Sequence, residues 1–503
     1  MLDASESTDI AKLPLAPKNP LPYRHRLRAV RSRIDGFQEL LDAGGPVTRI
    51  VLAPKWVFPT AVLIASPQGA RDVLGRTDEI ADRGETTTMI QMRRLMGGNL
   101  LDLPHHQWLP RRRAVQPMFT KKHVPRYAGH MAGAAQTVID GWYDGGTVDL
   151  DTECRALTLR ALGRSVLGVD LDSRADTVGP ALRTALSWVA DRATRPVQLP
   201  QWVPTPSQQR ARRANATLHQ LAAEILAAVR ADPTRDAPLV RALINAADPQ
   251  TGQPLSDDDI CHELVLFILA GHDTTSTTLT YSLWALGHDP AIQDRVLDEV
   301  RALGDRPLTP DDVPRLGHTV RVLHEALRLC PPGVGTPRML KKDLAVDGYR
   351  VAAGTMAVVS FYAMHRDPEL WDDPLRFDPD RFLPERSQGR SRWQYLPFGG
   401  GPRSCIGDHF AMLEAALALA TIIRAVRIES LNDDFPLAAP FTVVAAEPIG
   451  ARVHARTSPR ARSTSHLPQR GSGVAGCFLD ELDARAQAEF GVDVGEVGLH
   501  GAR

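Results

Sequence analysis

One uninterrupted helix of great length is the feature that most constrains this chain of 503 residues. Ser256 followed by Asp259 forms a capping-box start, and Gly287 is a natural C-terminal stop. The roughly 31 residues between them correspond to about 46 Å at about 1.5 Å per residue. A helix of that length crosses an entire domain, so the other elements are expected to pack around it.

The rest of the pattern is mostly helical between about 108 and 286, with strands near both ends of the chain. Apolar spacing predicts further helices over 67–74, 210–230, 290–303, 317–329 and 407–426. Period-two runs and an Asp-Gly turn predict strands over 47–51, 60–64, 344–346, 349–351 and 356–360. We therefore expect one mainly α domain with small β-sheets over 21–455. A flexible leader is expected over 1–20, and a flexible tail over 456–503 with a short helix at 479–490.

Charge and cysteine usage exclude several classes of protein. The 59 basic residues balance 59 acidic ones, so the net charge does not indicate nucleic acid or an anionic membrane as a partner. No apolar run approaches the roughly 18 residues of a membrane span, and the N-terminus lacks a signal-peptide pattern. The five cysteines form no CxxC pair, which argues against a disulfide framework or a structural zinc site and favours the cytoplasm. Three of them are read as packed thiols: Cys154, Cys261 and Cys330.

The fourth cysteine in the chain has a different setting, Phe398-Gly-Gly-Gly401-Pro-Arg403-Ser-Cys405-Ile-Gly407. Glycines allow turns closed to other residues and a close approach to a flat ligand. Cys405 stands just before a predicted helix, where the helix dipole favours a thiolate, a good ligand for iron. Arg403 offers a cation for a carboxylate, and Phe398 could shield the sulfur from water. A phosphate loop is the rival interpretation, and the absence of a Lys-Ser/Thr pair argues against it.

These residues resemble the haem-ligand signature of the cytochrome P450 family, F-x-x-G-x-R-x-C-x-G, at every fixed position. The resemblance extends over about residues 20–455. It implies that Cys405 is the axial thiolate ligand of haem iron, with Phe398, Arg403 and Gly407 at the cofactor site. The cofactor implied is haem b (heme b, iron protoporphyrin IX).

A second motif, Ala270-Gly271-His272-Asp273-Thr274, lies in the middle of the long helix. A mid-helix glycine costs about 1 kcal/mol relative to alanine, and side-chain hydroxyls can bond to the backbone one turn earlier. The residues alone fit a local distortion with room for a small ligand as well as a tolerated glycine with solvated threonines. The resemblance implies an oxygen-binding groove in which Thr274 delivers protons, Asp273 supplies them, and Ala270 and Gly271 shape the pocket.

Glu325 and Arg328, three residues apart on a predicted helix, can form an ion pair. Taken alone they are best read as a surface pair. The family carries E-x-x-R at this place together with an arginine from a later coil, and Arg381 matches that arginine. The resemblance therefore implies a structural triad of Glu325, Arg328 and Arg381.

Haem propionates need cations or hydrogen-bond donors. Trp108 and Arg112 lie four residues apart on one helical face and resemble the family's W-x-x-x-R. Pro110 between them is tolerable in the first turn of a helix. Arg338 matches an arginine that precedes a family strand, so the implied propionate partners are Trp108, Arg112, Arg338 and Arg403. Core packing is the alternative for Trp108.

The resemblance implies a haem-thiolate monooxygenase that inserts one oxygen atom from O2 into a lipophilic small molecule. No flavin or iron–sulfur domain is visible, so an external ferredoxin or flavodoxin with its reductase is expected. Arg111, Arg112 and Arg113 are candidates for docking that partner, and a solvated basic stretch is an equal reading for Arg111 and Arg113. The chain lacks the membrane anchor of microsomal members.

Two rival functions remain open, a peroxide-driven haem-thiolate enzyme and a non-catalytic haem-thiolate binder or sensor. The Asp273-Thr274 pair argues against both. The substrate pocket is expected near Phe267 and Ala270 and the ranges 85–101 and 188–202. Their mostly apolar character fits a fatty acid, a terpene or a polyketide-like ligand.

Overall fold

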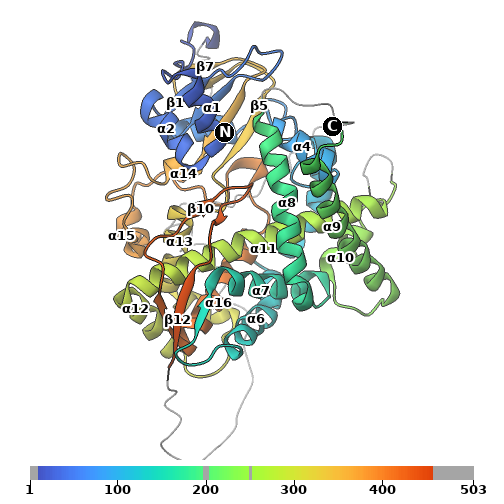
Figure 1. The fold of residues 1–503 in the computed structure, drawn as a ribbon, viewed down its shortest axis with the longest axis vertical. Coiled ribbons are helices and arrows are strands. Elements are labelled where there is room, and N and C mark those ends of the chain that lie inside the picture. Colours follow the sequence, from blue (N-terminus) through green and yellow to red (C-terminus); the bar gives the residue numbers. More distant parts are fainter. Residues whose placement is uncertain (1–8, 196–202, 248–251, 457–503) are drawn as a thin grey trace, which may run out of the picture.

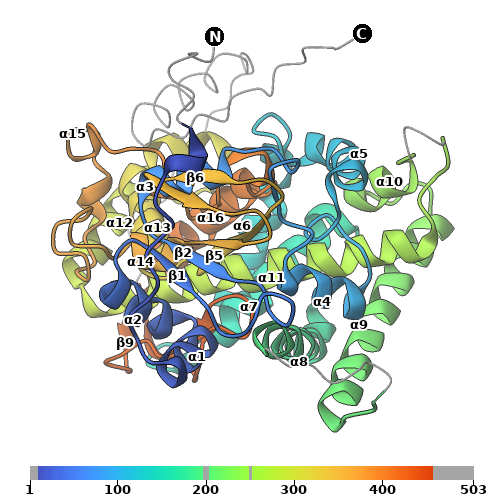
Figure 2. The same cartoon turned by 90° about the horizontal axis from the view of Figure 1, so that it is seen from above.

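The computed structural model describes residues 9–195, 203–247 and 252–456. Most of this chain forms a helical mass, and a smaller lobe holds the largest sheet and the first two helices (Figures 1 and 2). The helical mass has its own apolar core, which includes Leu264 and Leu417, and the smaller lobe has another, which includes Leu63 and Val359. The expected mainly α fold with small sheets is confirmed.

Helix α11, Asp257–His288, runs through the helical mass (Figure 1). Ser256 caps it as predicted, with its hydroxyl accepting the Asp259 N–H at 3.1 Å. The prediction that Gly287 ends the helix is wrong, because the helix continues to His288. Gly287 instead serves packing, since a Cβ there would lie 2.2 Å from Ser430 Oγ.

The other helices surround α11, and α7, α9 and α16 pack directly against it. Their bounds are α1 Tyr23–Ser32, α2 Ile34–Gly44, α3 Pro67–Leu74, α4 Thr87–Met96, α5 His105–Val115, α6 Ala128–Asp140, α7 Leu150–Leu162, α8 Ala175–Thr194, α9 Pro206–Ala231, α10 Pro238–Ile244, α12 Pro290–Arg301, α13 Gly317–Leu329, α14 Phe361–Met364, α15 Pro384–Ser387 and α16 Asp408–Ala425.

Within the described residues, four small sheets hold the strands, and the largest has the order β1-β2-β8-β5-β3. Its pairs are antiparallel except β2 with β8, where Leu63 lies opposite Val358. The strand bounds are β1 Val47–Ile50, β2 Ala61–Ile64, β3 Ala81–Asp82, β4 Thr147–Asp149, β5 Gly335–Leu340, β6 Leu344–Val346, β7 Tyr349–Val351, β8 Met356–Ser360, β9 Val426–Ser430, β10 Leu437–Ala438, β11 Val444–Ala445 and β12 Gly450–Ala455.

One predicted helix start differs in a way that matters for the site. Pro110 was expected in a first turn, but α5 begins at His105, so the proline lies inside the helix. Trp108 and Arg112 nevertheless share a face of α5, because the helix continues on both sides of Pro110.

The expected leader is only partly outside the fold. From residue 9 onward the chain is docked: the Asn19 N–H donates to the Arg49 carbonyl at 2.8 Å, and the Asn19 side chain donates to the Leu40 carbonyl at 2.7 Å. These bonds attach Asn19 to β1 and to α2, and the Arg350 N–H of β7 donates to the Pro14 carbonyl at 2.8 Å. The expected flexible leader is thus held on the fold at these residues. The expected tail and its short helix lie outside the described residues, apart from Arg456.

Candidate functional site

The cysteine segment folds as a tight loop in front of α16. The Cys405 N–H donates to the Phe398 carbonyl at 2.9 Å and closes the loop, and the Gly407 N–H donates to Cys405 Sγ at 3.3 Å. Gly401 has a φ of +71°, and a Cβ there would lie 1.9 Å from the Leu74 carbonyl oxygen. Glycine is thus required at this position by the close approach of the loop to the end of α3.

Cys405 lies deep within the protein, yet its side chain is exposed, unlike the three other cysteines in the described part of the chain. The two facts together indicate an internal hollow in front of the sulfur. Burial raises the pKa of the Cys405 thiol to about 11, and the opposing effects of the Gly407 N–H and Arg112 are smaller. The charge of Asp408, the first residue of α16, raises this pKa further. A coordinated metal ion would remove the proton outright.

The middle of α11 forms a second open surface. Ala270 is exposed and Thr274 is half-buried, whereas the adjacent Leu269 is buried. Thr274 Oγ1 donates to the Ala270 carbonyl at 2.7 Å, which is the predicted bond to the preceding turn. Gly271 faces away to α7, where a Cβ would lie 2.8 Å from Leu162 Cδ1. Helix α11 packs on α16, the helix that Cys405 precedes.

Asp273 is 1% exposed and is held by a partner that the sequence did not indicate. Arg155 of α7 donates to Asp273 Oδ1 at 2.5 Å and to Asp151 Oδ2 at 2.7 Å. Thr442, between β10 and β11, donates to Asp273 Oδ2 at 3.5 Å. No local pattern could have identified Arg155, because it lies 118 residues from Asp273.

The three residues expected to form a structural triad meet in a buried cluster. Arg328 donates to both Glu325 oxygens, at 2.7 and 2.8 Å, and Arg381 Nε donates to Glu325 Oε1 at 3.1 Å. Arg328 also donates to the His365 and Pro374 carbonyls, both at 2.7 Å. The cluster therefore fixes the coil that follows α14 against α13.

The aromatic and cationic residues expected around a cofactor gather beside the cysteine segment. The Arg403 guanidinium lies over the Trp108 ring at 4.0 Å, and Arg112 lies at 5.5 Å from the same ring. Arg112 donates to the Ser404 carbonyl at 2.9 Å, and Arg403 donates to Asp78 Oδ2 at 2.6 Å. Trp108 is thus both a buried core residue and a platform for two cations.

A further arginine, Arg83, joins this group without having been predicted. Burial lowers its pKa to about 9, and the nearby charges of Arg338 and Arg403 lower it further. Burial, with Arg403 adding to it, likewise lowers the pKa of Arg338 to about 10. None of the described residues accepts a hydrogen bond from Arg83 Nε or from Arg403 Nη1. The cluster is therefore short of negative charge.

Comparison with known proteins identifies this arrangement. The cytochrome P450 family model matches residues 16–451. The chain belongs to the cytochrome P450 family. Pentalenene oxygenase of Streptomyces avermitilis is 31% identical over 424 residues, which are 84% of this chain and 93% of that protein. Cyclooctat-9-en-7-ol 5-monooxygenase of Streptomyces melanosporofaciens is 32% identical over 394 residues, 78% of this chain and 84% of that protein. Cyclooctatin synthase of the same organism is 33% identical over 401 residues, which are 79% of this chain and 86% of that protein.

The protein is thus a cytochrome P450 monooxygenase, and membership implies a haem-thiolate cofactor. The residues of this P450 fit such a group. A cysteine sulfur faces an internal hollow, and the surplus of buried arginines matches the two negative charges of haem propionates. The unsatisfied Arg83 and Arg403 nitrogens are the donors that propionate oxygens would accept.

One expected partner surface of the P450 is corrected by the structure. Arg111 was a candidate for docking a redox partner, but it points inward and donates to Glu263 Oε1 at 3.0 Å and to Asp259 Oδ1 at 2.8 Å. Arg112 is bound to the cysteine segment, which leaves Arg113 as the exposed member of the three. No helix in the described ranges is long and apolar enough to span a bilayer.

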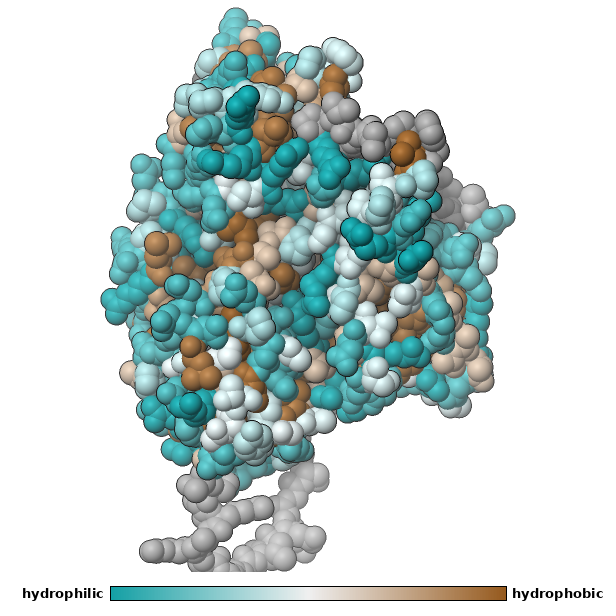
Figure 3. Space-filling view, in the orientation of Figure 1, coloured by the Kyte–Doolittle hydropathy of each residue, from teal (hydrophilic) through white to brown (hydrophobic). Residues whose placement is uncertain are grey.

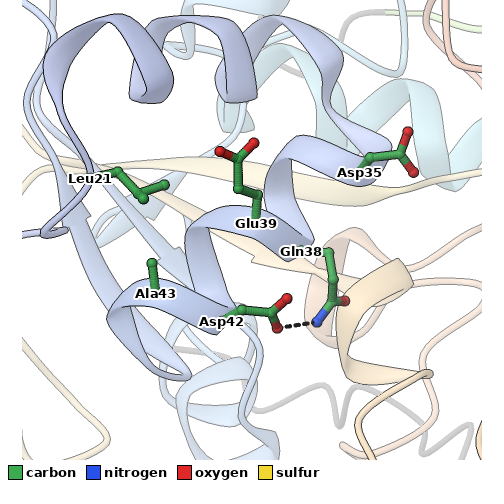
Figure 4. Close-up of a pocket in the computed structure, with 6 residues that line it drawn as sticks. All are labelled: Leu21, Asp35, Gln38, Glu39, Asp42 and Ala43. Carbon is green, nitrogen blue, oxygen red and sulfur yellow. Dashed lines mark hydrogen bonds between the residues drawn. The ribbon is translucent and has the colours of Figure 1, made fainter.

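The surface of the P450 offers a second depression away from the cysteine. Figure 4 shows it along α2, beside Leu21 of the segment that precedes α1, and there Gln38 donates to Asp42 at 2.7 Å. Its lining residues are Leu21, Asp35, Gln38, Glu39, Asp42 and Ala43. None of these is a candidate site residue. On the face drawn in Figure 3, apolar side chains lie in small groups among hydrophilic ones.

Proposed function

We propose that this P450 inserts one oxygen atom from O2 into a lipophilic small molecule, using haem b held by Cys405. The deep yet exposed sulfur of Cys405 is the observation that supports the proposal, together with the open surface at Ala270 and Thr274 on a helix that packs on α16. Trp108, Arg112, Arg338 and Arg403 are the proposed propionate partners, and Arg83 is added to them. Electrons come from a separate ferredoxin or flavodoxin with its reductase.

The proposed substrate is a cyclic terpene hydrocarbon or alcohol. The names of the similar Streptomyces proteins, a pentalenene oxygenase and a cyclooctat-9-en-7-ol 5-monooxygenase, support this class. The expected pocket wall near Phe267 is apolar and buried, and α4 adds buried methionines, which adapt to irregular apolar ligands. Part of the expected wall, residues 196–202, lies outside the described residues.

A bound haem with a thiolate ligand supplies the activation of O2, because electron donation from the sulfur favours O–O cleavage. The hydroxyl of Thr274 holds a proton at Oγ1 beside the hollow. Arg155 keeps the Asp273 carboxylate turned toward α7. Once separated from Arg155, that carboxylate takes up a proton from water and passes it to Thr274 Oγ1. The apolar wall at Phe267 orients the substrate and excludes water.

Oxygen labelling tests the proposed function. The holoprotein, a ferredoxin, its reductase and NADPH are incubated with a cyclic terpene hydrocarbon under isotopically labelled O2. We expect one labelled oxygen atom in each product molecule. Unlabelled product oxygen, which shows that the atom comes from water, overturns the proposal in favour of another reaction class. Turnover with hydrogen peroxide and none with the reductase system does the same. Absence of any haem spectral shift across a lipophile library supports a non-catalytic binder.

Replacement of Thr274 by alanine is expected to uncouple electron use from product formation. Without the hydroxyl, product formed per NADPH consumed falls by roughly 100-fold, the low end of what one proton-transfer group contributes. The measurement compares NADPH consumption, hydrogen peroxide release and product yield. Thr278→Ala is the matched control, because Thr278 makes the same kind of bond one turn later, to the Thr274 carbonyl at 3.1 Å. Equal coupling in the two variants contradicts the role of Thr274.

A further inference from the structure

The segment 97–103, between α4 and α5, is attached to both walls of the hollow. The Leu100 N–H donates to Glu263 Oε2 of α11 at 3.0 Å. Three residues later, the Leu103 carbonyl accepts from Arg403 Nη2 of the cysteine segment at 3.0 Å. Three residues span at most about 10 Å, so the segment 97–103 bridges the two walls along one edge of the hollow.

Glu263 lies on the side of α11 that faces the hollow. Ala270 and Thr274 follow it by seven and eleven residues, and residues at these intervals share one face of an α-helix. Glu263 is therefore about two turns, or roughly 10 Å, from the open surface at Ala270. The bond to Leu100 consequently places the segment 97–103 at the edge of the space that a ligand occupies.

The carboxylate of Glu263 is almost inaccessible to solvent, at 1% exposed, and it is paired. Arg111 Nη1 donates to Glu263 Oε1 at 3.0 Å, and Arg111 Nη2 donates to Asp259 at 2.8 Å. Burial of a charged pair costs more than burial of well-packed apolar residues of similar volume. Beyond its pairing with Arg111, Glu263 fixes the backbone of the segment 97–103 through the Leu100 N–H.

The segment 97–103 is itself a preformed turn with its own internal hydrogen bonds. It begins at Gly97, which ends α4 with a φ of +81° and packs against His262. Within it, the Asn99 N–H donates to Asp102 Oδ1 at 2.9 Å, and the Leu101 N–H donates to Asn99 Oδ1 at 3.0 Å. These internal bonds survive if the bond to α11 breaks.

We propose that Glu263 is a positioning residue that, together with Arg111, holds the segment 97–103 as a latch across the edge of the hollow. The latch sets the rates at which ligands enter and leave the hollow. The inference rests on the proposed function, because the hollow is taken as the haem and substrate site. It adds to that function a control of access by a group that touches neither haem nor substrate.

Ligand-exchange kinetics of the holoprotein test the latch. Phenylimidazole binding is followed by stopped-flow at the haem Soret band in the wild type, E263Q and E263A. Alanine removes the acceptor for Leu100, so the association and dissociation rates are expected to rise together by about 10–100-fold, the effect of losing a charge-assisted hydrogen bond. The Kd stays unchanged, because a latch alters both rates equally. Glutamine keeps an acceptor, so E263Q lies between the wild type and E263A.

Glu299 supplies the matched control, since its carboxylate also accepts backbone N–H groups from another element, those of His318 at 2.6 Å and Thr319 at 2.9 Å. E299A is expected to leave both phenylimidazole rates unchanged. Rates in E263A equal to those of the wild type overturn the latch, as does a changed Kd with an unchanged association rate. If E263A does not load haem, E263Q carries the same test.

Hydrogen exchange separates failure of the latch from failure of the proposed function. Amides of the segment 97–103 are expected to exchange at least about 10-fold faster in E263A than in the wild type, as the lost acceptor at Leu100 requires. Unchanged exchange overturns the latch whatever the haem spectra show. If wild-type protein gives no phenylimidazole shift, the proposed haem site fails, and exchange alone then decides the latch.

Discussion

Cys405→Ser is expected to abolish thiolate ligation and, with it, product formation. The variant's reduced carbon monoxide complex loses the red-shifted Soret band of thiolate coordination. Turnover falls by more than about 100-fold, beyond the roughly 10–100-fold cost of altering a residue that merely supports a metal ligand. Serine retains the shape and the Gly407 N–H contact, so a folding defect is not the expected cause. Carbon monoxide difference spectra and product yield measure the two effects.

Cys261→Ser is the control for this change. Cys261 lies on α11, is 7% exposed and does not face the hollow. This variant keeps the thiolate band and its activity. A Cys405→Ser protein with an unaltered carbon monoxide spectrum shows that another group binds the iron, and it contradicts the proposed function.

Glu325→Ala is expected to destabilise the protein by about 3–5 kcal/mol, the cost of removing one partner from a buried ion pair. The Glu325 carboxylate is fully buried and accepts from Arg328, Arg381 and the Asp378 N–H at distances of 2.7 to 3.1 Å. Its loss leaves two buried guanidinium groups without a counter-charge. The coil that Arg328 attaches to α13 is then released as well. Denaturant unfolding of the holoprotein measures the change in free energy.

Arg295→Met provides the comparison for Glu325→Ala. Arg295 forms a two-bond ion pair with Asp380, at 2.7 and 2.9 Å, but half of the arginine side chain is in solvent. Exposed pairs contribute about 0.2–1 kcal/mol, so this variant unfolds near the wild-type midpoint. Similar losses in the two variants contradict the structural role assigned to the triad.

Much of the fold follows from short-range sequence patterns. The cap at Ser256, the Asp-Gly hairpin and the helix over 317–329 were all predictable because neighbouring residues determine them. The prediction that Gly287 ends the helix was wrong for a physical reason. A glycine that ends a helix and a glycine that permits close packing look identical in the sequence. The difference lies in Ser430, which is 143 residues away.

Some residues of the candidate site were likewise predictable from the sequence, and others were not. The residues around Cys405 were predictable from a compact motif, whereas Arg83 and Arg155 act through partners that only the tertiary structure brings near. The raised pKa of Cys405 was also beyond the sequence, because its largest cause is burial, which only the tertiary structure shows. Arg111 shows a similar limit, since a basic stretch gives no sign of which member turns inward to Glu263.

The surplus of buried arginines near Cys405 has a consequence for the life of the protein in a cell. Without a dianion among them, these charges repel one another in a poorly hydrated place, so the chain without cofactor is held together less firmly. A group that binds only the native state adds its binding energy to stability. Iron and porphyrin supply then govern how long the polypeptide survives proteolysis as well as how much of it is active.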